Sequence, residues 1–525
     1  MNSTVDNKAS LVSVTNDALV FVVSRRVEIL IAFFISVIAF FLFVSEFFMQ
    51  SHGQRFPWVP LQDQVYAGRW FTPVVFWLNY GANIPVLGPL TSIFVYVIST
   101  VLVLQLWRFL DVGYKLVVLT CVASTFPMFT AVLYYNYASL QWPMSIFLGL
   151  IGLIFASSAG IGSVILGAIF VMFAMACNQT VLSTLCVVFF GIVLRRFIDT
   201  PVVSSFVRWP TVKPLLAIGL SIAIGAAFYR VSLDVLSIPV SHATSVGIGG
   251  PGYLDRVVKV ATASFTHLWL TQPDFLIGTK RLLAAAILGG VLVQAARTII
   301  ENRKSPGGIL LGIVFLSLLY VLLVVSGKAM FFVSDNNSFY TYRYNLGLAY
   351  FHMFFACALL STYRSRIIVS VGLIICTVIS VRFIQVDLVR QAVLHRGQTH
   401  DLAIANRILY RIESLPNLDL TKQYTLVRIG EYPAFRQKSF KSRGRSFEHR
   451  GADHMDRGFL TETWAPAAVM DFLGTEINFA SAGYNPNFQQ DIARGRDIVK
   501  AQGRLRWPDD SSVFIEGDYI YVYMR

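Results

Sequence analysis

The residues best suited to chemistry lie in one polar segment, QDQVYAGRW at positions 62–70. It contains an acid, Asp63, followed by the adjacent pair Arg69 and Trp70. A carboxylate can take a proton from a hydroxyl group as a general base, and a guanidinium group can stabilise a departing phosphate. We therefore predict that Asp63 and Arg69 serve one site and assign Trp70 to binding of a sugar or an acceptor.

A second acid, Glu46, competes with Asp63 for the role of base. It lies in the last turn of the first apolar run, where a carboxylate is costly unless it meets a cavity or a partner. An acid at a helix end can also extend to the membrane surface without any chemical role. Either acid can be the base and the other an orienting group, and we place Asp63 first.

A later polar segment, 327–344, provides further groups suited to phosphate. Lys328 and Arg343 lie near its two ends, with Asp335 and Asn336 between them. Guanidinium matches the geometry of phosphate. We assign the two cations to binding of a donor phosphate, and Asp335 and Asn336 to binding of the sugar or acceptor. The alternative for this segment is anchoring among aromatic residues at the membrane surface.

Aromatic and amide side chains meet in a third segment, YYNYASLQWP at positions 134–143. Tyr135, Asn136, Tyr137 and Gln141 could stack on a sugar ring and form hydrogen bonds with its hydroxyl groups. An aromatic belt at the membrane surface is the alternative explanation.

No sequence pattern indicates a metal, a cofactor or nucleic acid. The eight histidines do not share a helix face with carboxylates at metal-ligand spacing. The glycine-rich segment 247–252 follows no strand and opens no helix, so it is not a phosphate-binding loop. The five cysteines fall inside apolar runs, which predicts no disulfide framework. The basic segment 436–457 lacks the interleaved aromatic residues of a nucleic-acid binder.

Long apolar runs separate these polar segments. The chain has 525 residues, of which 55% are hydrophobic and 14% charged, whereas roughly a quarter of a soluble domain is charged. This composition excludes a soluble enzyme and predicts a polytopic helical membrane protein. Runs long enough for a core of ~30 Å predict about eleven spans, near 28–48, 84–107, 115–135, 142–157, 160–177, 180–194, 213–229, 281–299, 308–326, 345–362 and 366–384.

Basic residues gather at alternate ends of these spans, and the positive-inside rule makes those ends cytoplasmic. An odd number of spans then places the N-terminus in the cytoplasm and the polar tail outside, in the periplasm of a Gram-negative cell. We predict a transmembrane domain over 1–384, with interfacial helices in its outer loops, including one near 253–270. A small α/β domain over 385–525 follows, with a helix near 386–414 and strands at YTLVRIG and VFIEGDYIYVYM.

A site on the outer face restricts the substrate, because ATP and nucleotide sugars are cytoplasmic. A sugar linked to a polyprenyl phosphate reaches that face through the membrane. Its transfer requires a base for the acceptor hydroxyl group and donors for the departing phosphate, which are the residue types found in these segments.

The segments together resemble a known family. Asp63, Gly68-Arg69-Trp70, the YYNY segment, Arg343 and the ending from Trp507 to Val522 are similar to the phage-type, serotype-converting O-antigen glucosyltransferases. The resemblance implies a C-type glycosyltransferase fold in the inner membrane, undecaprenyl-phosphate glucose as donor, and the lipid-linked O-antigen of lipopolysaccharide as acceptor.

The resemblance also implies a flippase and a cytoplasmic donor synthase as pathway partners. Where the family has paired acids early in the first loop, this chain has Ser51-His52-Gly53, so Asp63 and Glu46 stay the candidates for the base. Two other functions are open at this stage. An O-antigen polymerase usually lacks a terminal domain, and a secondary transporter would show related halves and broken spans.

Overall fold

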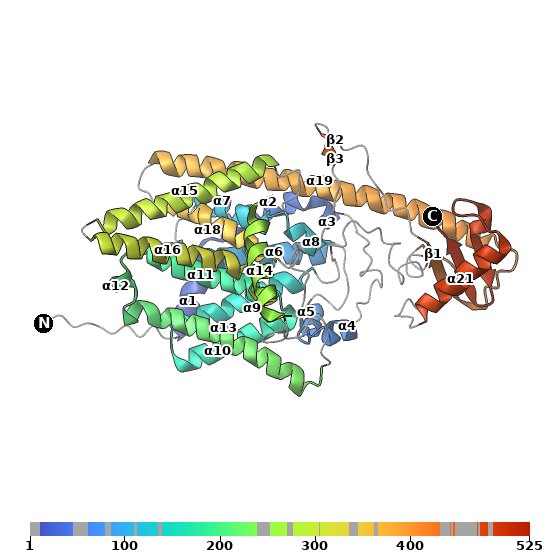
Figure 1. Ribbon diagram of the computed structural model, residues 1–525, viewed down its shortest axis with the longest axis horizontal. Coiled ribbons are helices and arrows are strands. Elements are labelled where there is room, and N and C mark those ends of the chain that lie inside the picture. Colours follow the sequence, from blue (N-terminus) through green and yellow to red (C-terminus); the bar gives the residue numbers. More distant parts are fainter. Residues whose placement is uncertain are drawn as a thin grey trace.

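The structure is a computed structural model, and it has a long helical body with a small α/β unit beyond one end (Figure 1). It describes residues 11–45, 61–78, 86–109, 113–134, 139–238, 252–269, 277–303, 305–334, 345–361, 366–430, 441–442, 445–446, 470, 473–480 and 487–524.

Apolar helices of varied length build the helical body. Its helices are α1 (Leu11–Ser24), α2 (Arg26–Ala39), α3 (Phe41–Ser45), α4 (Leu61–Tyr66), α5 (Thr72–Leu78), α6 (Leu87–Leu106), α7 (Tyr114–Ser124), α8 (Phe129–Leu133), α9 (Gln141–Ala156), α10 (Ile161–Cys177), α11 (Val181–Asp199), α12 (Val203–Phe206), α13 (Trp209–Val235), α14 (Tyr253–Trp269), α15 (Ile277–Glu301), α16 (Pro306–Ser326), α17 (Ala329–Val333), α18 (Gly347–Ser361) and the first part of α19 (Arg366–Glu413).

Five helices in the described part of the chain are long and apolar enough to cross a membrane: α6, α11, α13, α16 and α19 from Val369 onward. Helix α16 is the most apolar, yet only 22% of its apolar window is buried within the protein. Leu310, Leu311, Val314 and Leu318 are each more than half exposed. A helix that is apolar on all sides and exposed is typical of contact with lipid. These features are compatible with the predicted helical membrane protein.

Two of the predicted spans are divided. The run predicted near 28–48 forms α2 and α3, and the run predicted near 115–135 forms α7 and α8. Pro127 lies in the second break, where a proline cannot donate a backbone hydrogen bond to continue a helix. Helix α14 lies where the sequence predicts an amphipathic helix.

Helix α12 lies at the end of the helical body opposite the tail unit (Figure 1). Basic residues precede and follow it in sequence, including Arg195, Arg196 and Arg208, and we call this the basic end. Here Arg196 donates to the backbone oxygen of Thr211 (3.2 Å), and Arg195 pairs with Asp199 (3.5 Å). The contacts join the end of α11 to the start of α13. Residues that the sequence assigns to the cytoplasmic face are thus adjacent in space.

Helices α9, α10 and α13 pack closely through glycines. A Cβ atom on Gly167 would lie 2.6 Å from the backbone oxygen of Gly152, and one on Gly225 would lie 2.7 Å from that of Ala168. Small residues at such positions let helix backbones approach, which is common between helices in membranes. This packing fixes the relative positions of the C-terminal ends of α10 and α13.

Helix α19 continues without a break from the helical body into the tail unit (Figure 1). Its 48 residues extend over about 72 Å at 1.5 Å per residue, roughly twice the length needed to cross a hydrocarbon core. The predicted division between residues 384 and 385 falls inside this helix, and the helix predicted near 386–414 is its second half.

The tail unit contains a four-stranded sheet in the order β4-β1-β6-β5. Strand β1 is parallel to both β4 and β6, whereas β5 and β6 form an antiparallel hairpin. The strands are β1 (Gln423–Ile429), β4 (Asn478–Phe479), β5 (Val513–Glu516) and β6 (Tyr519–Tyr523), and β2 (Lys441–Ser442) pairs separately with β3 (Arg445–Ser446). Both strand segments that the sequence predicts are confirmed.

The sheet lies between the end of α19 and helix α21 (Phe488–Gln502). Tyr424 and Leu426 of β1 share a core with Ile408 of α19, and Val427 and Ile429 share a core with Val499 of α21. This alternation follows from the strand period of two. Helix α19 also belongs to the core of the helical body, through Cys376, Ile379 and Phe383. The position of the tail sheet is therefore set by the helix that leaves the helical body.

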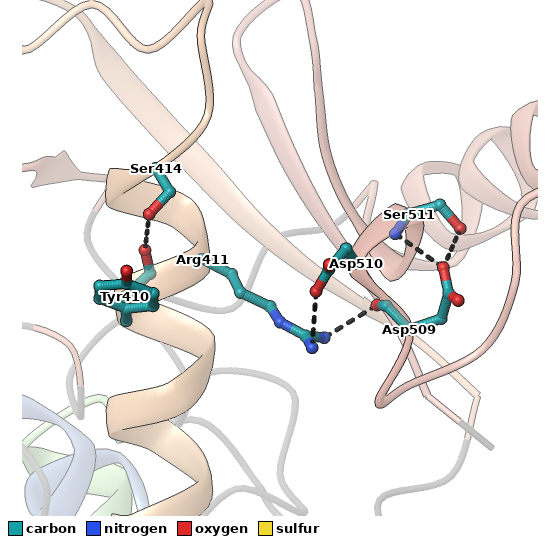
Figure 2. A network of polar contacts seen from close by, with 6 residues as sticks. All are labelled: Tyr410, Arg411, Ser414, Asp509, Asp510 and Ser511. Carbon is teal, nitrogen blue, oxygen red and sulfur yellow. Dashed lines mark hydrogen bonds and ion pairs between the residues drawn. The ribbon is translucent and has the colours of Figure 1, made fainter.

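Arg411 of α19 fixes the turn before β5 (Figure 2). Its guanidinium donates to the backbone oxygen of Asp509 (2.8 Å) and pairs with Asp510 (2.8 Å). It also lies 4.5 Å from the ring centre of Trp507. The Asp509 carboxylate accepts from the backbone N–H and the hydroxyl group of Ser511, which lowers its pKa.

Candidate functional site

The segment containing Arg69 begins where α4 ends, at the end of the helical body that faces the tail (Figure 1). Arg69 N donates to Gln64 O (2.9 Å) and Gly68 N to Val65 O (2.8 Å). This is the bond pair of a Schellman motif, with Gly68 at φ +79° in the left-handed position that favours glycine. The turn reverses the chain and directs it into α5.

Side chains from two other helices brace this turn. Gln179, between α10 and α11, donates to Ala67 O (2.8 Å) and to the hydroxyl group of Tyr229 (2.7 Å). Tyr229 of α13 in turn donates to Gly68 O (3.1 Å). The close packing of α10 and α13 therefore determines where Arg69 lies.

Arg69 is half-buried between α4 and α9. Its Nη1 donates to Gln64 Oε1 (3.0 Å), and its guanidinium carbon lies 5.9 Å from the ring centre of Trp142. Its Nε is buried without a hydrogen-bond partner among the described residues. Buried polar atoms of this kind require a partner, and an anion would supply one.

Gln141, at the start of α9, lies in the same region. Its Nε2 donates to Thr72 Oγ1 (3.1 Å) and to the backbone oxygen of Cys177, while its Oε1 is buried without a described partner. Asn178 is similar, because its Oδ1 accepts from Thr180 N (3.0 Å) and its Nδ2 has no described partner. An acceptor and a donor are thus available near Arg69.

Trp70 differs from its neighbour Arg69. Its indole N–H donates to Ser232 Oγ of α13 (2.9 Å), and its ring packs edge-on against Phe71 and Phe173. In the structure Trp70 connects this segment to α10 and α13. Its assignment to the sugar stays a prediction.

Lys328 lies between α16 and α17 and is only 2% exposed. Its Nζ donates to Asn345 Oδ1 (2.8 Å) and lies 5.8 Å from the ring centre of Phe331. Burial lowers its pKa to about 7. The sequence predicts Lys328 near the start of an outer loop. In the structure, its side chain is buried within the protein.

The segment from Gln179 to Ser183, where α11 begins, connects these two regions. Gln179 contacts the Arg69 segment, and Ser183 Oγ accepts from Met330 N, two residues after Lys328 (3.0 Å). Arg69 and Lys328 therefore lie at the same end of α11.

The remaining predicted residues are not placed by the structure. Asp63 belongs to helix α4, but its side chain lies outside the described part. The other residues outside the described part are Glu46, Tyr135, Asn136, Tyr137, Asp335, Asn336 and Arg343. The predicted proximity of Arg69 and Arg343 is therefore untested.

A second buried polar cluster lies on α19, and the sequence did not single it out. Thr130 Oγ1 of α8 donates to Asp387 Oδ1 (2.5 Å), and Arg390 Nη1 donates to the backbone oxygen of Pro127 (2.5 Å). Both side chains are at most 1% exposed. An acid and an arginine three residues apart share a helix face, and this spacing was the available signal.

Gln391 extends the same cluster to the break between α2 and α3. Its Oε1 accepts from Leu42 N (3.0 Å) and Phe43 N (3.3 Å), and its Nε2 donates to Ala39 O (2.7 Å). The amide thus satisfies backbone groups that the helix break exposes.

Comparisons of the chain with protein-family models, with curated proteins and with solved structures found no match. Within the described part of the chain, no group of three or more His, Cys, Asp and Glu side chains could hold a metal ion.

Proposed function

We propose that the chain is an integral-membrane glycosyltransferase of the C-type. It transfers glucose or another hexose from a polyprenyl-phosphate donor to lipid-linked O-antigen on the periplasmic face of the inner membrane. The observation that carries the proposal is the half-buried Arg69, whose guanidinium carbon lies 5.9 Å from the ring centre of Trp142, at the end of an apolar helical body opposite its basic end. A cation in that position suits an anionic headgroup whose tail lies in the membrane.

The proposal gives Asp63 and Arg69, the two charged residues between positions 62 and 70, separate roles. Asp63, or Glu46 in its place, takes the proton of the acceptor hydroxyl group. Arg69 binds the donor phosphate, with Arg343 as a further cation. The phosphate gains negative charge as the sugar bond breaks, so fixed guanidinium donors stabilise the transition state more than the ground state.

The Schellman turn supports this assignment of Arg69. Its backbone is fixed by the bonds around Gly68 and by Tyr229 and Gln179. A pre-positioned donor need not reorganise when charge develops. The pairing with Gln64 leaves several of the five guanidinium N–H groups available for phosphate oxygens.

The test is transfer of radiolabelled glucose from polyprenyl phosphate to a lipid-linked glycan by the purified protein, with no nucleotide present. We expect transfer by the unchanged protein and its loss in Arg69→Ala. Arg230→Ala is the matched control, because Arg230 is an arginine of α13 that pairs with Asp234 (3.1 Å). Absence of transfer with a competent donor and acceptor would refute the proposal.

The proposed topology has eleven spans, a cytoplasmic N-terminus and a periplasmic tail. A reporter that is active only outside the cytoplasm should be active when fused after the last residue and inactive in the connection between α11 and α13. The expectation rests on the basic end around α12 and on the position of the tail opposite to it. A well-expressed but inactive C-terminal fusion would contradict the span count.

A further inference from the structure

The tail unit contains an open cleft of about 570 Å³ that has no role in the proposed transfer. Its walls come from the end of β1 at Ile429 and Gly430, the end of β6 at Tyr523, and the last turns of α21. The volume falls in the range of small-molecule sites, roughly 300–1,000 Å³.

The position of the cleft in the fold is one that ligands commonly use. Strands β1 and β6 are parallel, with Ile429 opposite Tyr523. Both strands therefore end at this edge of the sheet. Ligands in open α/β sheets bind in crevices outside the carboxyl ends of parallel strands.

Four basic side chains line the cleft: Arg496, Lys500, Arg504 and Arg506. None of the described residues that line it is acidic. Arg496 and Lys500 are exposed and lie one helical turn apart on α21. Lys500 lies in the last turn of α21 and interacts favourably with the dipole of that helix. The dipole does not account for the presence of the three arginines.

Two of the arginines are fixed by neighbours that leave donors free. Arg506 Nε donates to the hydroxyl group of Tyr523 (3.0 Å). Arg504 donates to Gln502 Oε1 (2.6 Å) and to Ser511 O (3.3 Å), and its guanidinium carbon lies 4.1 Å from the ring centre of Phe514. Each guanidinium has five N–H groups, so both keep unused donors in a defined orientation.

No salt bridge in the described part of the chain involves any of the four cations, although Arg504 interacts electrostatically with Glu516. Four positive charges in one concave surface raise the local concentration of anions. Planar guanidinium groups match phosphate oxygens in pairs, which favours a phosphate over a simple halide ion.

The distance from the helical body favours a soluble ligand over lipid headgroups. Leu394 still packs against the core of the helical body, and Ile404 is already in the core of the tail. The ten residue steps from Leu394 to Ile404 correspond to about 15 Å of helix. That exceeds the Debye length of ~8 Å at physiological ionic strength, so headgroups at the body end would act weakly on the cleft.

We propose that this cleft is a binding site for a soluble phosphate ester of about the size of a sugar phosphate. Arg496 and Lys500 provide the charge that attracts the ligand, and Arg504 and Arg506 provide oriented donors. The site is separate from the Arg69 region, and its function does not depend on the proposed glycosyl transfer.

The test is isothermal titration calorimetry of the full-length protein in phosphatidylcholine nanodiscs, with glucose 1-phosphate as the probe and neutral glucose as the reference. We expect saturable binding of glucose 1-phosphate and none of glucose. The variant Arg496→Gln with Lys500→Gln should lose at least about tenfold in affinity, because it removes two of the four positive charges that attract the ligand.

The control variant is Lys422→Gln with Arg494→Gln, which also removes two exposed charges from the tail. Arg494 stacks on Tyr519 (5.4 Å) outside the cleft. This variant should bind with an affinity within about twofold of the unchanged protein, since it loses only screened charge. Unchanged thermal unfolding confirms that both variants are folded.

Three results would overturn the proposal. The first is absence of saturable binding to the unchanged protein, and the second is an equal loss of affinity in the two variants. The third is loss of glucose 1-phosphate binding when phosphatidylglycerol is added to the nanodiscs, which would show that lipid headgroups occupy the cleft.

Discussion

Replacement of Arg411 by alanine tests whether α19 and the tail sheet form one rigid unit. The guanidinium bridges the helix to the turn before β5 through Asp509, Asp510 and Trp507 (Figure 2). The substitution removes these contacts without altering either hydrophobic core. We expect the β5–β6 hairpin to open more often from α19.

The size of the effect follows from the individual contacts. A charged donor to a backbone oxygen contributes about 1.5–3 kcal/mol, and the contact with the Trp507 ring about 0.5–1 kcal/mol. The Asp510 carboxylate is 96% exposed, so its ion pair adds at most a few tenths of a kcal/mol. The total of about 2–4 kcal/mol corresponds to roughly a 30- to 900-fold increase in local opening.

Hydrogen exchange followed by mass spectrometry measures this opening in peptides from β5 and β6. The matched control is Arg407→Ala, because Arg407 lies 5.3 Å from the same Trp507 ring and should change exchange by no more than about fivefold. Equal exchange in the two variants would refute the reasoning, since the bonds to the turn would then contribute nothing beyond the aromatic contact.

Three further predictions concern the helical body. Asp63→Asn should lower the rate of transfer by about 10²–10⁴-fold while donor binding is retained. If Asp63→Asn keeps a near-normal rate of transfer and Glu46→Gln loses it, the base is Glu46. Arg69→Lys and Arg343→Lys should each lower turnover more than donor binding, because lysine cannot bind two phosphate oxygens at once as arginine does. Normal kinetics in both variants would refute the shared phosphate site. Burial lowers the pKa of Lys328 to about 7, so the unfolded state binds the extra proton between pH 7 and the ordinary lysine value of ~10.4. Stability should therefore fall as pH is lowered from 10 to 7, by up to ~1.4 kcal/mol per pH unit, and thermal unfolding of Lys328→Met should lack this dependence.

Hydropathy and periodicity predicted most of the helices because each element is defined by its own residues. The apolar runs near 84–107, 142–157 and 160–177 match α6, α9 and α10 closely. The strands of the tail follow in the same way from alternating β-branched and aromatic residues. These local signals do not depend on which elements become neighbours.

The sequence does not predict the continuity of α19, because polar residues follow the apolar run at 366–384 and mark the end of a span. Asp387 and Arg390 fall where the hydropathy drops, yet both are buried against α8. Their partners are Thr130 and the backbone oxygen of Pro127, which are more than 250 residues away in sequence. The spacing of Asp387 and Arg390 places them on one helix face, but the local pattern does not identify partners at such separation.

Burial of Lys328 was missed for a related reason. Its hydrogen-bond partner, Asn345, is 17 residues away in sequence. Its aromatic neighbour, Phe331, resembles an ordinary aromatic residue of the membrane surface when only the sequence is considered. A lysine near a loop is normally exposed. Only the packing of α17 against α11 shows that this one is enclosed.

Helix α19 helps to position two segments of the predicted site, the one that contains Glu46 and the YYNY segment. Gln391 satisfies the backbone at the break between α2 and α3, so it fixes the direction of α3, which ends one residue before Glu46. Asp387 bonds α8, which ends at the start of the YYNY segment. Both segments therefore leave the helical body at points defined by α19. Since the same helix belongs to the core of the tail, the tail sheet and these two points share one rigid element.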